Sequence, residues 1–186
     1  MEAVKKFEIN KITKIVLVAL VGSLLLTISA KLKIPFYPVP MTMQTFVVLF
    51  LGITLGSKIG VLTVSLYLIE GIFGLPVFAN TPEKGIGLIY FTGPTMGYLL
   101  GFLMAVYVAG SFNYEKGLIS KFLKLVFSVS FIYLLGIIWL GILIGWDKPL
   151  FKLGVQPFLL AELFKILLLI ALSQISLKIK KLIKIT

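Results

Sequence analysis

The sequence contains no cysteine, no histidine and no arginine, and all 18 of its basic residues are lysine. These absences exclude disulfides, thiolate or imidazole metal sites, a cysteine nucleophile and a histidine acid–base relay. Charged residues make up only 13% of the 186 residues, whereas soluble domains carry about 25%. With 59% apolar residues and a mean hydropathy of +1.10, the composition predicts an integral membrane protein.

Six apolar runs approach the length of a helix that crosses a bilayer, which is about 20 residues. The runs cover residues 12–30, 41–56, 59–74, 94–110, 121–145 and 157–177. They predict an all-α integral membrane protein of six transmembrane helices, forming one domain over residues 1–186. The second to fourth runs are short and contain glycine, so tilt or partial burial within the bundle is expected.

The lysines lie mainly at the edges of the apolar runs and near both ends of the chain. This distribution is typical of juxtamembrane anchoring to lipid and does not suit a nucleic-acid-binding groove. If all six runs cross, the termini and the loops on their side carry 12 lysines, whereas the opposite loops carry five. The positive-inside rule then predicts that the N- and C-termini are cytoplasmic.

The loops predicted on the outer side are long, and each carries proline beside aromatic residues. They cover residues 31–40, 75–93 and 146–156. Proline stiffens a backbone and aromatic rings offer flat apolar faces. We therefore expect the outer pole to hold a ligand.

Apart from lysines in the first turn of a run, three charged side chains fall inside apolar runs, namely Glu70, Glu162 and Lys165. A charge in hydrocarbon is costly, so such a side chain faces a cavity or a partner and is a functional candidate. Glu162 and Lys165 are three residues apart, which places them on the same face of a helix. The alternative interpretation is a pair that neutralises itself and has only a structural role.

Amide and hydroxyl side chains are predicted at the same pole as these charges. They are Gln44, Thr45, Asn80, Tyr90 and Tyr98. Apolar walls with a few convergent polar groups are the usual makeup of a small-molecule site. Each residue also has a structural interpretation, because tyrosines form interfacial belts, glutamine caps helices and asparagine forms turns.

No phosphate-binding loop occurs in the sequence, so we expect the chain to have no ATPase of its own, and any energised role must draw on a partner or on a gradient. An intramembrane enzyme is the weakest interpretation, because no nucleophile with an activating base and no metal cluster stands out.

Three stretches of the chain carry a recognisable pattern. They are Pro38–Thr45, Gly71–Gly87 followed by Gly93–Tyr98, and Gly154–Phe158 with Glu162 and Lys165. In their order and spacing, across essentially the whole chain, they resemble the BioY family of biotin transporters. Members of that family are the substrate-binding S components of energy-coupling factor (ECF) transporters.

The resemblance implies an ECF S-component-like bundle in the plasma membrane of a prokaryote, which captures biotin from outside. It also implies a transmembrane coupling protein and two cytoplasmic ATPases as partners, with biotin as the transported ligand and no cofactor. In such families a small-residue pattern in the first span contacts the coupling protein. Here this pattern falls on Ala19 and Ser23.

Biotin has a ureido head with two N–H donors and one carbonyl acceptor, a thioether ring and a valerate carboxylate. A carboxylate accepts from N–H, an ammonium donates to a carbonyl, and an asparagine does either. We therefore expect Asn80, Glu162 and Lys165 to bind the ureido head. Further ligand contacts are expected from Gln44, Phe78, Tyr90 and Tyr98.

Two other interpretations stay open at this point. The first is an S component for a related cofactor such as lipoate, which also joins a sulfur-containing ring to a valerate. The second is a membrane scaffold subunit without a ligand, which predicts that the outer pole is filled.

Overall fold

The computed structural model describes residues 2–35, 41–83, 85–115 and 117–183, with side chains from residue 11 onward. Residues 38–40 of the first motif and Lys84 of the second lie outside the described residues. The elements are the helices α1 (Glu2–Lys31), α2 (Gln44–Ile72), α3 (Met96–Ser111), α4 (Leu118–Ile144), α5 (Leu150–Gly154), α6 (Leu159–Ala171) and α7 (Ser173–Ile183), the 3-10 turns η1 (Gly87–Thr92) and η2 (Gln156–Phe158), and the short antiparallel strands β1 (Lys33–Ile34) and β2 (Met41–Thr42).

The prediction of an all-α membrane protein is confirmed at this level. Among the described residues, four helical segments are long and apolar enough to cross a membrane: Lys11–Lys31, Gln44–Ile72, Leu118–Ile144 and Leu150–Ala171. Helix α3 is apolar but shorter. Six crossings and the side on which the termini lie stay predictions.

Helix α2 covers both the second and the third predicted span. Its backbone is broken between the two spans at Gly56. Gly56 has φ +76° and ψ 175°, a conformation that side chains disfavour and glycine tolerates. The two arms on either side pack together, so that a Cβ on Gly60 would lie 3.7 Å from the Cα of Gly52. The sequence-based division into two spans therefore corresponds to two arms joined by a reversal without a loop.

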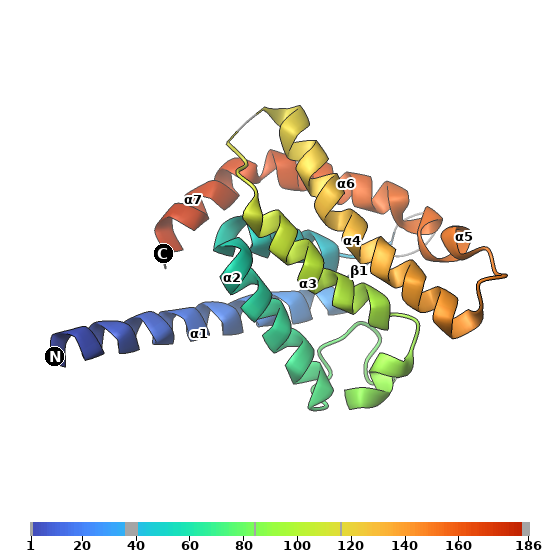
Figure 1. Ribbon diagram of the computed structural model, residues 1–186, viewed down its shortest axis with the longest axis horizontal. Coiled ribbons are helices and arrows are strands. Elements are labelled where there is room, and N and C mark those ends of the chain that lie inside the picture. Colours follow the sequence, from blue (N-terminus) through green and yellow to red (C-terminus); the bar gives the residue numbers. More distant parts are fainter. Residues whose placement is uncertain (1, 36–40, 84, 116, 184–186) are drawn as a thin grey trace.

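The helices form a bundle in which α3 and α4 run side by side and α1 lies at one edge (Figure 1). Both marked ends of the chain lie at the left of Figure 1, whereas α5 lies at the right. The end of the bundle that carries α5 also carries the start of α6, which positions the residues of the candidate site.

Glycines bring α3 very close to its neighbours, because the four-residue spacing of Gly97 and Gly101 leaves one face of the helix without side chains. A Cβ on Gly101 would lie 2.5 Å from the Cα of Ile132 in α4, and one on Gly97 would meet the backbone oxygen of Leu135. On the other side of α3, a Cβ on Gly52 of α2 would lie 2.8 Å from the backbone oxygen of Val106. Helices α2, α3 and α4 therefore touch backbone to backbone.

We expect Gly101→Ala to destabilise the protein by about 1–3 kcal/mol, because the added methyl forces α3 away from α4. This is a net effect, since the better helix propensity of alanine offsets up to about 1 kcal/mol. The measurement is the thermal unfolding midpoint of the detergent-purified protein. Leu100→Ala, at the neighbouring exposed position of the same helix, is the control and should change the midpoint much less. An unchanged midpoint for Gly101→Ala would contradict the close approach.

Candidate functional site

A cavity of about 500 Å³ lies at the end of the bundle that the sequence predicts to be the outer pole. Its walls come from β2, the start of α2, the turn after α2, α3, α4, and the region from α5 to α6. The lining is mostly apolar, and the volume falls within the range of about 300–1,000 Å³ that is usual for small-molecule sites. The cavity therefore suits a small ligand with few polar groups.

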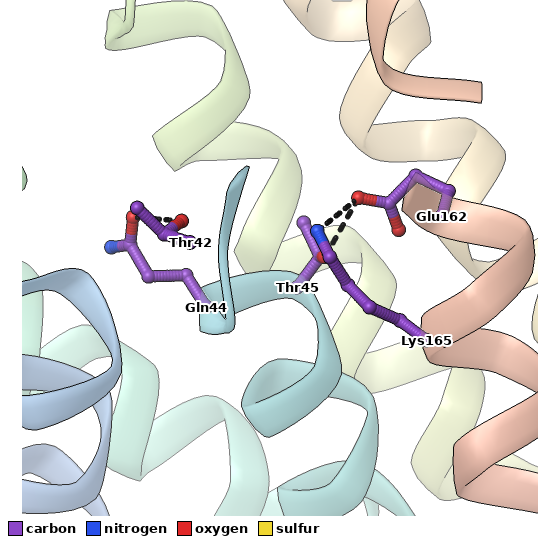
Figure 2. Close-up of polar contacts among 5 residues, drawn as sticks. All are labelled: Thr42, Gln44, Thr45, Glu162 and Lys165. Carbon is purple, nitrogen blue, oxygen red and sulfur yellow. Dashed lines mark hydrogen bonds and ion pairs between the residues drawn. The ribbon is translucent and has the colours of Figure 1, made fainter. Parts of the chain in front are cut away.

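Three polar side chains form a closed cluster in this cavity, the Thr45–Glu162–Lys165 cluster (Figure 2). Lys165 Nζ donates to Glu162 Oε1 at 2.7 Å and to Thr45 Oγ1 at 2.9 Å. Thr45 Oγ1 in turn donates to the same Glu162 oxygen at 2.8 Å. Both charged residues are only 5% exposed, so each charge depends on the other within the apolar bundle. The predicted placement of Glu162 and Lys165 on one helical face is confirmed.

The cluster leaves one acceptor and one donor unused. Glu162 Oε2 is buried and has no hydrogen-bond partner among the described residues. The Lys165 ammonium has three donors, and the cluster occupies two of them. Tyr133 of α4, which also lines the cavity, interacts electrostatically with Glu162. Within the described part of the chain, no three acidic residues gather to hold a metal ion.

Gln44 lines the cavity beside this cluster and is itself held on both sides. Its Nε2 donates to the Tyr67 hydroxyl at 2.9 Å, and its Oε1 accepts from Thr42 at 3.3 Å. Figure 2 shows the contact with Thr42. The amide thus engages other side chains and makes no bond to the backbone at the start of α2.

Asn80 reaches the cavity from the turn that follows α2. Its φ of 58° lies in the left-handed region, which asparagine tolerates better than most residues. Its side chain makes no hydrogen bond with the residues that the structure describes. The amide is therefore available to a ligand.

Phe78 and Tyr90, which the sequence suggests as ligand contacts, lie in the core and do not line the cavity. They are 1% and 4% exposed, and their rings stack with centroids 4.8 Å apart. Burial raises the pKa of the Tyr90 phenol above its ordinary value, and the protonated hydroxyl donates to Ala79 O at 2.7 Å. The two rings thus support the Asn80 turn on its core side, away from the cavity.

Tyr98 does line the cavity, and its hydroxyl donates to Gly154 O at 2.9 Å. This bond joins α3 to the end of α5. Tyr133 is a cavity residue that the sequence reasoning missed. It is the single tyrosine of the run 121–145, and a phenol in the middle of an apolar run was the available signal.

Ala19 and Ser23, the predicted contacts for a coupling protein, are 3% and 1% exposed and face the inside of the chain. Ser23 Oγ donates to the Glu70 carboxylate of α2. This hydrogen bond accounts for one of the three ionisable residues of the apolar runs. The contact of these two positions with a partner stays a prediction.

The three motifs of the sequence meet in this one cavity. Gln44 comes from the first, Asn80 and Tyr98 from the second, and Glu162 and Lys165 from the third. The sequence also matches the family model described as "BioY family" over residues 2–184. The chain belongs to the BioY family. The resemblance suggested by the three motifs is thereby confirmed.

Relatives of this BioY chain are similar over most of its length. The probable biotin transporter BioY of Pyrococcus horikoshii is 36% identical over 155 residues, which cover 83% of this chain and 90% of that one. The biotin transporter BioY of Thermotoga maritima is 36% identical over 159 residues, covering 85% and 90%. The fold is similar to a crystal structure of the S-component for biotin from an ECF-type ABC transporter, with a TM-score of 0.71 and 24% identity over 93% of this chain and 92% of that one.

In this BioY chain, we expect Lys165→Met to destabilise the ligand-free protein by about 3–5 kcal/mol, because it leaves the buried Glu162 carboxylate without its cation. The double variant Glu162→Gln/Lys165→Met should recover most of that loss. Both are measured as thermal unfolding midpoints in detergent.

The exposed pair Asp147–Lys148 is a matched control, since its side chains are 73% and 54% exposed. Replacing Lys148 by Met should change the stability by less than about 1 kcal/mol. If the double variant at Glu162 and Lys165 were no more stable than Lys165→Met, the two charges would not depend on each other.

Proposed function

We propose that this chain is the biotin-binding S component of an ECF-type uptake transporter. It captures biotin at the extracytoplasmic pole and delivers it inward together with a transmembrane coupling protein and two cytoplasmic ATPases. The observation that carries the proposal is the convergence of the three motifs on one apolar cavity containing a buried acid–base pair. The biotin transporters among its relatives support the choice of ligand.

The unused groups of the cluster match one edge of the ureido head. Glu162 Oε2 needs an N–H donor and the Lys165 ammonium has one donor left. A ureido edge presents an N–H and a carbonyl side by side, so it satisfies both groups at once. The Asn80 amide supplies a further donor and acceptor.

The remaining wall residues suit the apolar part of the ligand. Tyr98 offers a ring face to the thioether ring, and Gln44 offers an amide that Tyr67 and Thr42 hold in place. Phe78 and Tyr90 act in this proposal through the Asn80 turn, because their rings lie behind it.

Lipoate is the second candidate ligand and fits the cluster less well. Its dithiolane ring has no N–H, so it cannot satisfy the buried Glu162 oxygen. A ligand-free scaffold fits less well again, because it explains neither the cavity nor the buried Glu162 oxygen that has no hydrogen-bond partner.

The membrane placement belongs to the same proposal. Six crossings, with the two arms of α2 as separate spans, place both termini in the cytoplasm of a prokaryotic cell and the cavity on the outside. The lysine asymmetry supports this orientation. Because the chain carries no phosphate-binding loop, the energy for accumulation comes from the ATPases of the complex.

The binding test is a biotin titration of the detergent-purified protein. Glu162→Gln and Lys165→Met should each weaken binding at least tenfold, which is about 1.4 kcal/mol, because each removes one side of the ureido contact. Asp147→Asn and Lys148→Met alter the exposed pair and should leave the affinity unchanged.

Lipoate should compete poorly with biotin in the same titration. If both cluster variants bound biotin as the wild type does, the pair would be structural only. If biotin neither bound nor raised the unfolding midpoint of the wild type, the scaffold interpretation would replace the proposal.

The orientation can be tested with single cysteines, since the chain contains none. Asp147→Cys lies in the loop proposed to be outside, and Glu115→Cys lies in the connector proposed to be inside; both positions are exposed. A membrane-impermeant maleimide should label Asp147→Cys on intact cells and Glu115→Cys only after permeabilisation. The reverse pattern would place the cavity on the cytoplasmic side.

A further inference from the structure

Lys31, the last residue of α1, reaches the turn that carries Asn80. Its Nζ donates to Phe78 O at 3.0 Å, to Thr81 O at 2.8 Å and to Thr81 Oγ1 at 2.7 Å. An ammonium has three donors, so this turn occupies all of them. Lys31 does not itself line the cavity.

The same turn is held from two other elements. The Tyr67 hydroxyl of α2 donates to Val77 O at 3.2 Å, and the Tyr90 hydroxyl of η1 donates to Ala79 O at 2.7 Å. The backbone oxygens of residues 77, 78, 79 and 81 thus each accept a bond from a side chain, and Asn80 lies among them. Its left-handed φ of 58° is unfavourable for an isolated residue, so the surrounding bonds maintain it.

We propose that Lys31 is a positioning residue for ligand binding: it fixes the Val77–Thr81 turn so that Asn80 stays at the cavity wall. The role of Lys31 rests on the proposed function, because the ligand whose binding it supports is taken to be biotin. Of the three side chains Lys31, Tyr67 and Tyr90, only Lys31 joins α1 to the turn, and its bonds fall on both sides of Asn80. Without them, the turn keeps the bonds to Val77 O and Ala79 O and the internal bond from Thr81 Oγ1 to Phe78 O, but it loses the tie from α1 on either side of Asn80.

The first test needs no ligand and uses the absence of native cysteine. Ala79 lies next to Asn80 and lines the cavity, so Ala79→Cys reports how readily the turn opens. Adding Lys31→Met should raise its maleimide labelling rate about fivefold. Lys33→Met is the matched control, because Lys33 is exposed two residues away and should leave the rate unchanged. An unchanged rate with Lys31→Met would overturn the proposal.

The second test is a double-mutant cycle on biotin affinity. Lys31→Met should weaken binding about threefold to tenfold. In an Asn80→Ala background it should weaken binding less than twofold further, because Lys31 acts through Asn80. Effects that multiply in the double variant would show that Lys31 acts elsewhere, and the proposal would fall. Lys33→Met should again have no effect.

The two failures can be told apart. If the wild type does not bind biotin, the proposed function fails, whereas the labelling test still decides whether Lys31 holds the turn. If Lys31→Met does not fold, Thr81→Val removes one acceptor of Lys31, together with the bond from Thr81 Oγ1 to Phe78 O, with little change of shape. This variant should raise the labelling of Ala79→Cys about twofold, and an unchanged rate would overturn the proposal as well.

Discussion

A carboxylate and an ammonium that are buried in an apolar bundle must compensate each other, and this constraint organises the cavity. Glu162 and Lys165 meet it with a 2.7 Å contact, and Thr45 closes the cluster from α2. The start of α2 and the start of α6 are thereby held together although 117 residues separate Thr45 from Glu162. This contact between the two helices is favoured because an unpaired charge in a low dielectric is strongly destabilising.

Local patterns in the sequence were enough to predict the long apolar helices and the pairing of Glu162 with Lys165. Apolar runs of about 20 residues predict helices, and the three-residue spacing of Glu162 and Lys165 correctly predicts their shared face. The glycine pair in α3 correctly predicts a close helix approach. Each of these features depends on residues within a few turns of each other, which is why the sequence alone reveals them.

Contacts between distant segments could not be predicted in the same way. Phe78 and Tyr90 are aromatic residues of a loop predicted to be outside, and nothing in their local sequence pattern distinguishes a residue of a cavity wall from a residue of the core. The same holds for the three bonds of Lys31, which span 47 and 50 residues of sequence. The runs 41–56 and 59–74 predict two spans but not the reversal at Gly56 that joins them, because the φ of a glycine is not visible in the sequence.

The contacts between helices are of two kinds, backbone contacts at glycines and contacts between side chains, and the two kinds differ in how easily they can be separated. Helices α2, α3 and α4 meet through backbone atoms at Gly52, Gly97 and Gly101, and backbone surfaces in contact cannot slide without collision. In contrast, α6 is joined to α2 at the site through the side chains of Glu162 and Lys165, which can rotate and re-pair. Separating α6 from α2 at the site therefore requires less displacement of backbone than separating α2, α3 and α4 from one another.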